Sequence, residues 1–257
     1  MKDNREIQNE SLVLVVGSIA VLSSIIGMIS FILTLFSSKK ISPDKNLTDQ
    51  LNKVLVPLGK KFEVRIVKEK TPNAFIIGPK VIFVTSGLVD ILTPREVISV
   101  LLHEVWHVLD LHIYKDLSYK YIIFYLAAFV AISSNAVIPF SGIIAFSLSC
   151  FIFEIPYKLI FGRKYEKMSD SYASKYGYGD ELISSLKKLD KVYTRLINSQ
   201  QCGFICKVES KITNELGEHP SLQTRVENLL KSKELEEAAK TNNLSKFKNI
   251  AIGFFKK

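Results

Sequence analysis

LLHEVWHVLDLH, residues 101–112, contains three of the four histidines of this 257-residue chain and encloses the pattern His-Glu-x-x-His. On an α-helix, residues four positions apart lie on one face, so His103 and His107 can direct their imidazoles at a common point. That arrangement suits two ligands of a tetrahedral zinc ion. Glu104 follows the first histidine, where it could take a proton from the attacking water and pass it to the leaving amine. The alternative is a packed helix that carries its histidines by chance.

The residues around the motif favour the zinc interpretation. Thr93-Pro94-Arg95-Glu96 is typical of a helix start, with Thr93 as N-cap, Pro94 at the first helical position and Glu96 able to close a capping box. The helix is predicted to begin near Pro94 and to run through Leu111 or beyond. Apolar neighbours would surround the motif with a low dielectric, which strengthens electrostatic interactions there; they are Val100, Leu101, Leu102, Val105, Val108 and Leu109.

A catalytic zinc site needs a third protein ligand, which must come from another segment. The sequence YEKMSDSYA offers Glu166 and Asp170, four positions apart on a predicted helix. One of them would bind the metal while the other orients a histidine or a backbone group. His112 is the rival ligand. It lies nine positions after His103, which rotates it by about 180° around the helix axis and away from the metal.

An apolar stretch near the N-terminus, Leu12 to Phe36, has no charged residue over 25 positions. At about 1.5 Å per residue, such a helix exceeds the ~30 Å hydrocarbon core of a bilayer. A signal peptide is the alternative, but its apolar region would be shorter and its start clearly basic. Here Lys2 and Arg5 are offset by three acidic residues, and no small-residue cleavage site follows. We therefore predict an uncleaved membrane anchor over residues 1–37.

A second apolar region, residues 119–161, is interrupted by SSNAVIPFSG at 133–142, whose Asn, Pro and Gly favour a turn. We predict two helices, about 119–137 and 140–161, that form a hairpin in the membrane. A shallow or re-entrant hairpin, or a pair of helices buried in the protein, is the alternative, because the second helix carries charged residues.

The distribution of charge predicts the orientation in the membrane. Lysines and arginines follow the first span and lie on both sides of the hairpin, whose turn has no charge. Because such residues are retained on the cytoplasmic side, residues 37–118 and 162–257 should share that side of an inner (cytoplasmic) membrane. The net charge of +9 then reflects Lys-rich segments beside anionic lipid headgroups. Nucleic-acid binding would call for a basic stripe interleaved with aromatic residues, and the sequence has no such stripe.

The remaining patterns predict a mainly α fold with a small β-sheet. FEVRIVKEK is predicted to form a strand, and FII and VIFVT a hairpin or two short strands about Gly78 and Pro79. Further helices are predicted over GRKYEKMSDSYASKYGYG, closed by Gly177, and over residues 221–240. The four predicted parts are the anchor (1–37), the first catalytic segment with the histidine motif (38–118), the hydrophobic hairpin (119–161) and the second catalytic segment with the third ligand (162–257).

The order of the motifs resembles the M48 family of integral membrane metallopeptidases, in particular its HtpX-like members and more distantly the CAAX prenyl protease. NAF is followed by a strand, SGLVDILTPREVISVLLHEVWH, a hydrophobic hairpin, RKYEKMSDSYA and EHPSLQTRVENL, so the likeness covers about residues 70–230. It implies a zincin-like domain with membrane-spanning helices. The chain departs from the HtpX-like pattern in having one early apolar segment where two are usual. Trp106 also stands where a small residue is common.

The resemblance implies roles for individual residues. It places the third zinc ligand at Glu166 and the partner acid at Asp170. His219 would stabilise the oxyanion or contact substrate, and Asp170 and Arg225 would form a supporting network. In the mechanism that we expect, an extended substrate pairs through backbone hydrogen bonds with an edge strand in the segment Asn73 to Val84, which starts with Asn73, Ala74 and Phe75.

We therefore expect a membrane-bound zinc endopeptidase with one Zn²⁺ per chain. Backbone hydrogen bonds depend little on the amino-acid sequence of the substrate. This mode of binding fits a quality-control enzyme that acts on unfolded or damaged membrane proteins. The alternatives are a protease that processes one specific substrate and a catalytically inactive M48-like scaffold or adaptor in the membrane. The presence of Glu104 argues against the scaffold, because a structural zinc site has no need of a general base beside its ligand.

Overall fold

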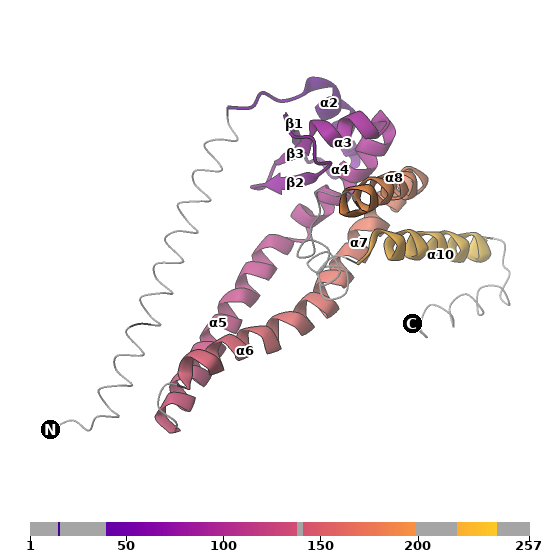
Figure 1. Ribbon diagram of the computed structural model, residues 1–257. Helices are drawn as coiled ribbons and strands as arrows, with labels where there is room; N and C mark the ends of the chain where they lie inside the picture. The colour runs from indigo at the N-terminus through magenta and orange to yellow at the C-terminus, as the bar shows by residue number, and fades with distance from the viewer. Residues whose placement is uncertain (1–14, 16–39, 138–140, 199–219, 241–257) are drawn as a thin grey trace. The chain divides into compact units, whose positions relative to one another are not determined.

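The computed structural model describes residues 15, 40–137, 141–198 and 220–240 (Figure 1). These residues are mostly helical and form one small sheet, which confirms the mainly α fold predicted from the sequence. The chain divides into two compact units. One contains Leu111–Ile160, and the other contains Pro43–Asp110 and the described residues that follow Ile160. Apart from Val15, the predicted anchor over residues 1–37 lies outside the described residues.

The sheet has three strands in the order β1-β3-β2. β1 pairs with β3 in parallel, and β2 pairs with β3 antiparallel, which confirms the predicted hairpin. Gly78 in the hairpin turn has φ of +70°, a left-handed conformation that glycine adopts without steric cost. One face of the sheet contributes Val64, Ile82 and Val84 to the core. The strands are Glu63–Val67 (β1), Ala74–Ile77 (β2) and Val81–Thr85 (β3).

The histidine motif lies on α4 (Pro94–Leu109), which starts as predicted. The Thr93 hydroxyl accepts the N–H of Glu96, and the Glu96 carboxylate accepts the N–H of Thr93 at 2.7 Å, which completes the capping box. α4 contacts β2, β3, α7 and α8. Its apolar face fills the core of this unit with side chains that include Val97, Leu101, Leu102 and Val105.

The end of α4 differs from the prediction. The helix stops at Leu109 because Leu111 adopts φ of +55°, in the left-handed region that breaks a right-handed helix. The prediction that α4 runs through Leu111 was therefore wrong. His112 begins the next helix and does not belong to α4.

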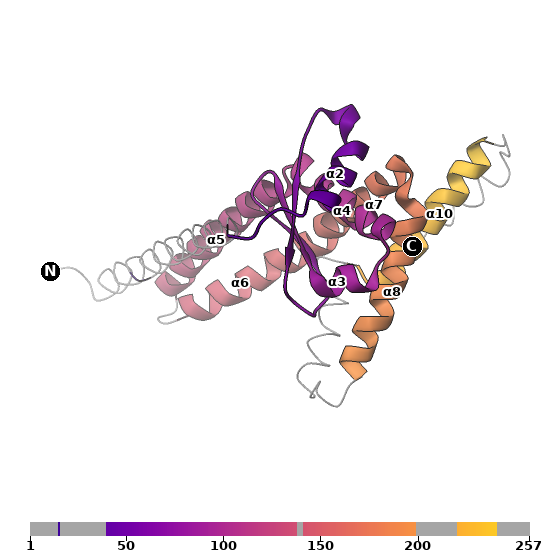
Figure 2. The ribbon, with the colours of Figure 1, turned by 90° about the horizontal axis from the view of Figure 1, so that it is seen from above.

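Among the described residues, five other helices belong to the same unit as α4. α7 lies beside α4, and α10 packs against α7 and α8 (Figure 2). Gly177, at φ of +80°, separates α7 from α8 as the sequence predicted. A π-helical turn, Ser174–Tyr178, contains that glycine. The helices are α2 (Lys45–Val54), with a 3₁₀ turn at Val56–Leu58, α3 (Ser86–Ile91), α7 (Arg163–Ala173), α8 (Gly179–Asn198) and α10 (Leu222–Lys240).

The other unit contains the predicted hydrophobic hairpin, in which α5 (His112–Val137) and α6 (Gly142–Tyr157) lie side by side (Figure 1). Apolar windows in these helices are long enough to cross a membrane. α5 begins before the predicted position 119, because the chain re-enters a helix directly after Leu111. Large apolar side chains are exposed along both helices, among them Tyr125, Phe129, Ile144 and Ile152.

α6 ends earlier than predicted. Pro156 lies in its last turn, and a proline there lacks the N–H that would bond the carbonyl four residues back. A π-helical turn, Lys158–Gly162, follows, as is common where the regular hydrogen-bond ladder is interrupted. The Tyr119 hydroxyl of α5 donates to the carbonyl of Phe153 at 3.1 Å and so joins the two helices near this turn.

Candidate metal centre

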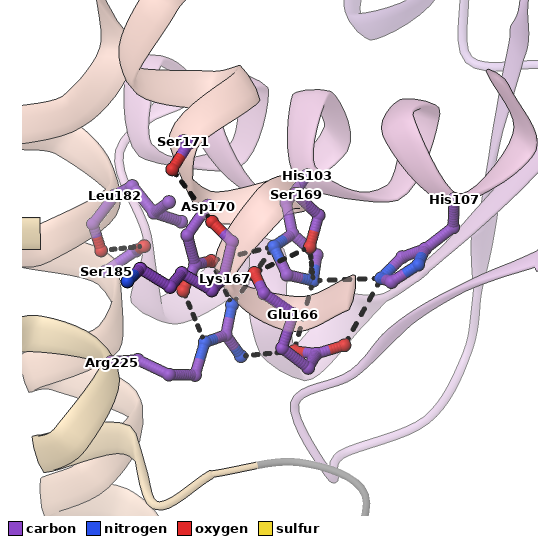
Figure 3. Close-up of polar contacts among 10 residues, drawn as sticks. All are labelled: His103, His107, Glu166, Lys167, Ser169, Asp170, Ser171, Leu182, Ser185 and Arg225. Atoms are coloured by element: carbon purple, nitrogen blue, oxygen red, sulfur yellow. Dashed lines mark hydrogen bonds and ion pairs between the residues drawn. The ribbon is translucent and has the colours of Figure 1, made fainter. Parts of the chain in front are cut away.

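Two helices from separate parts of the sequence bring three metal-ligand side chains together. His103 and His107 on α4 face Glu166 on α7 (Figure 3). Nε2 of His107 lies 3.3 Å from Nε2 of His103 and 3.3 Å from Oε1 of Glu166. Oε2 of Glu166 lies 3.5 Å from Nε2 of His103. One ligand atom from each residue therefore lies within 4.8 Å of the other two.

Asp170 determines which nitrogen of His103 faces this cluster. Nδ1 of His103 lies 2.8 Å from Oδ1 of Asp170. A carboxylate only accepts hydrogen bonds, so Nδ1 carries a proton and Nε2 is the nitrogen whose lone pair can bind a metal. That lone pair faces Nε2 of His107 and the Glu166 carboxylate, which is 1% exposed.

The chemistry of these donors fits a zinc ion. Lone pairs and a buried carboxylate that converge on one point repel one another unless a cation or a proton lies among them. Two imidazole nitrogens and one carboxylate oxygen form a ligand set of catalytic zinc sites, which leave a fourth position for water or substrate. The two histidines from α4 and the acid from α7 supply that set.

Arg225 on α10 supports the centre from the side of His103. Its Nη2 and Nε donate to the two oxygens of Asp170 at 2.6 and 2.9 Å. Nη1 lies 3.4 Å from Oε2 of Glu166. Oδ1 of Asp170 thus accepts from both His103 and Arg225. The Ser221 hydroxyl accepts the N–H of Thr224 at 3.2 Å and caps the turn of α10 that carries the arginine.

The charges of this network are set by burial and by the partners. Burial alone would raise the pKa of Asp170, but the Arg225 guanidinium and the hydrogen bond from His103 lower it overall. Burial alone would lower the pKa of Arg225, whereas Asp170 and Glu166 raise it. The two residues therefore form a buried ion pair. Glu104 differs, because burial raises the pKa of its carboxyl against the opposing effect of the two histidines.

Sequence reasoning missed Ser169. This fully buried serine donates to the backbone carbonyl of Glu166 at 2.9 Å, and its Oγ lies 3.4 Å from Nε2 of His103. Serines in helices often bond a carbonyl one turn back, so their presence in a sequence marks no site. Only the packing of α7 against α4 reveals its proximity to the cluster.

The remaining predicted site residues lie in several different parts of the chain. Glu104 is partly buried on α4, and Asp170 and Arg225 join the network described above. His219 lies outside the described residues. His112, the rival ligand, opens α5. Asn73 precedes β2, and Ala74 and Phe75 begin it.

β2 forms one edge of the sheet. The Thr85 N–H donates to the carbonyl of Asn73 at 3.0 Å, so these two residues form a hydrogen-bonded pair. Because such pairs alternate along an antiparallel ladder, the N–H and C=O of Ala74 and Ile76 point away from β3. The opposite edge differs, since Pro43 bridges to Arg65 on β1.

Comparisons with known proteins show which family the chain resembles. Residues 43–233 match Peptidase family M48. The chain is 27% identical over 256 residues to "Protease HtpX" of Psychrobacter sp. (strain PRwf-1), with 84% of each chain covered. It is 26% identical over 209 residues to "Protease HtpX homolog" of Pyrobaculum calidifontis, with 68% of this chain and 59% of that protein covered.

A solved structure shares the fold. Ste24p of S. mikatae aligns with a TM-score of 0.59 and 21% sequence identity, over 83% of this chain. The aligned region is 57% of that longer protein. At this identity the likeness concerns the fold, which supports the zincin-like architecture predicted from the motifs.

Proposed function

This chain belongs to peptidase family M48, and we propose that it is a membrane-bound zinc endopeptidase with one Zn²⁺ per chain. Family membership and the two protease relatives support proteolytic activity. The observation that carries the zinc assignment is the convergence of His103, His107 and Glu166 from two helices. Glu104 beside the first histidine supplies the group that peptide hydrolysis needs in addition to the ligands.

His103, His107 and Glu166 would hold the zinc ion. When bound, zinc polarises the scissile carbonyl and acidifies the attacking water. Glu104 accepts the proton of that water and returns it to the leaving amine. Asp170, held by Arg225, keeps His103 in the tautomer that presents Nε2. We assign oxyanion stabilisation or substrate contact to His219.

The substrate is proposed to bind as an extended strand along β2. The outward N–H and C=O of Ala74 and Ile76 support this mode, because an edge strand can pair with an added strand through its free backbone groups. These two residues replace Asn73 and Phe75 as the proposed pairing positions. Most of the affinity would come from the backbone, which favours unfolded or damaged polypeptides over one fixed sequence.

We propose that α5 and α6 span the inner (cytoplasmic) membrane as part of a multi-pass protein whose catalytic unit faces the cytoplasm. The length and composition of these helices support insertion, and so do their exposed apolar side chains. Lysines and arginines flank the hairpin, as expected of cytoplasmic segments. The substrates would then be misfolded membrane proteins or unfolded chains near the bilayer.

The Glu104→Gln variant of the full chain tests the assignment. Zinc content and casein cleavage are measured in detergent, with and without a chelator. We expect one zinc per wild-type chain and metal-dependent cleavage. Glu104→Gln should keep the zinc and cleave at least about 100-fold more slowly, because it loses general-base catalysis, whereas His107→Ala should lose both. Zinc loss or retained proteolysis in Glu104→Gln would contradict the mechanism, and zinc binding without cleavage in the wild type would favour the scaffold.

A further inference from the structure

Two aromatic residues directly precede metal-site residues on the two ligand-bearing helices. Trp106 comes before His107 on α4, and Tyr165 comes before Glu166 on α7. The Trp106 ring lies edge-on to the imidazole of His107, with centroids 5.8 Å apart and planes at 74°. Trp106 also packs against Tyr165, with centroids 6.2 Å apart and planes at 40°. This aromatic flank, Trp106 with Tyr165, joins α4 and α7 beside His107.

The two histidines are thus contacted in different ways. His103 is oriented through its Nδ1 by a carboxylate and an arginine. His107 has two ring neighbours, since it also meets the His103 ring in an edge-to-face contact with centroids 5.0 Å apart. Edge-to-face contacts between aromatic rings favour particular mutual orientations, so they restrict rotation of the imidazole about its side-chain bonds. Restricting a ligand before the metal arrives lowers the entropic cost of binding.

We propose that Trp106 is a positioning residue for His107. With Tyr165 packed against it, Trp106 holds the imidazole in the orientation that directs Nε2 toward Glu166. This inference rests on the proposed zinc site. It requires no contact between Trp106 and substrate, and it assigns to this bulky side chain the orientation of the His107 ring. Zinc affinity, rather than the chemical step alone, should therefore respond to substitution at position 106.

Zinc affinity of Trp106 variants, measured on the full chain by competition with a chromophoric chelator, tests this role. Trp106→Leu and Trp106→Gly should bind zinc about 2- to 10-fold more weakly, the range expected for loss of one edge-to-face contact. Trp106→Phe keeps an aromatic edge and should bind zinc within about 2-fold of the wild type. Phenylalanine as weak as leucine would overturn the aromatic contact as the cause.

A double-mutant cycle identifies the part played by Tyr165. Tyr165→Leu should weaken zinc binding in the wild-type chain but not in the Trp106→Leu chain, because Tyr165 acts through the tryptophan. The matched control is Tyr176→Leu, which disrupts a ring pair with Tyr172 at 4.8 Å. That variant should lose stability without losing zinc affinity. Equal loss of zinc affinity in Tyr176→Leu would reduce the effect to general destabilisation and overturn the proposal.

Trp106 also offers a readout that is independent of activity, because it is the chain's only tryptophan. Co²⁺ absorbs visible and near-ultraviolet light, so a Co²⁺ ion held by His107 should quench Trp106 emission as one equivalent is added. His107→Ala should abolish this quenching. One zinc per chain with wild-type affinity in Trp106→Leu would overturn the positioning role alone. Absence of zinc from the wild type would instead overturn the proposed function.

Discussion

Asp170 links His103 to Arg225 and so determines the geometry of that histidine. Its carboxylate is 4% exposed and accepts from both His103 and Arg225. In Asp170→Asn the buried guanidinium loses its nearest counter-charge, and Glu166 remains as the other acid within 3.4 Å. We expect zinc affinity to fall about 10- to 100-fold and the free energy of unfolding to fall by about 1–3 kcal/mol. Chelator competition and denaturant unfolding measure these two changes.

Asp180→Asn is the matched control for this substitution. Asp180 also accepts two hydrogen bonds from a cation, Lys233, at 2.7 and 2.8 Å, but it is 71% exposed. Exposed ion pairs contribute little, so its loss should change the free energy of unfolding by less than about 1 kcal/mol and leave zinc affinity unchanged. If the two aspartate variants behaved alike, burial of the Asp170 network would not matter.

Glu96 is a second buried acid, located at the start of α4. It accepts hydrogen bonds from the Thr93 N–H at 2.7 Å, the Ser184 hydroxyl at 2.6 Å and the Lys188 ammonium at 2.7 Å. Burial alone would raise the pKa of Glu96, but these hydrogen bonds lower it to about 2. The carboxylate thereby joins the N-terminus of α4 to α8.

This pKa predicts how stability depends on pH. The folded-state pKa of Glu96, about 2, lies below the 4.5 of an unperturbed carboxyl. Its ionised form therefore stabilises the fold above pH 4.5, and this contribution is lost as the pH falls toward 2. Because Lys188 is 39% exposed, solvent screening limits the contribution to about 1–2 kcal/mol.

Glu96→Gln tests that contribution. We expect the variant to be less stable than the wild type at pH 7 by about 1–2 kcal/mol. The difference should shrink between pH 4.5 and 3, because the wild-type carboxyl then begins to lose its advantage. Urea unfolding at pH 7, 4.5 and 3 measures the two curves. A difference that stays constant with pH would mean that the charge of Glu96 is not its cause.

Among the secondary-structure elements, those with local signals could be predicted from the sequence. Thr93 and Glu96 close the capping box within one turn, and Gly78 marks the turn of the hairpin. The end of α4 could not be predicted, because apolar periodicity continues to Leu111 and no glycine or proline announces the break there. The parallel pairing of β1 with β3 could not be predicted either. Alternation of apolar and polar residues predicts which face of a strand is buried, but not which strand lies beside it.

The edge strand β2 gives a prediction about substrate binding. Ala74→Pro removes an outward-facing N–H without removing a bond to β3, as proline is tolerated on the free side of an edge strand. We expect the fold to persist and kcat/KM for casein to fall by at least about 10-fold, because the ring removes one hydrogen bond and blocks the approaching chain. Peptidase kinetics and thermal unfolding of the same preparation measure both effects.

Ala74→Ser serves as the control, because it changes the side chain and keeps the N–H. It should cleave casein at close to the wild-type rate. If Ala74→Pro were fully active, the substrate would not pair with β2 at this position. If Ala74→Pro unfolds, Ile76→Pro takes its place in the experiment, because the N–H of Ile76 also faces away from β3.

For the complete catalytic unit, the metal centre is an arrangement of segments that lie far apart in the sequence. His103 and His107 could be predicted to converge because helical periodicity is local. Glu166 and Asp170 could be proposed from their own four-residue spacing, but only the resemblance chose between them. Arg225 lies 122 residues after His103, so its place in the network could be proposed from the resemblance but not from any local pattern. The contact between Trp106 and Tyr165 had no sequence signal for the same reason.

Zinc that joins α4 to α7 should stabilise the folded chain. A ligand that binds only the folded state raises the free energy of unfolding by about 2.7 kcal/mol at a concentration of 100 times its Kd. For a chain of this size, that corresponds to a rise in Tm of about 5–10 °C. We therefore expect removal of zinc by a chelator to lower Tm by this amount, and added zinc to restore it. Thermal unfolding of the full chain in detergent measures the shift.

Two variants separate metal ligation from catalysis in this experiment. Glu104→Gln should keep the complete zinc-dependent shift, because Glu104 is proposed as a base and not as a ligand. Glu166→Gln should show a much smaller shift, because an amide oxygen is a weaker zinc ligand than a carboxylate. The shift reports a bond between two helices, so it should appear whether or not a substrate is cleaved. An equal shift in Glu166→Gln and in the wild type would mean that zinc does not link α7 to α4.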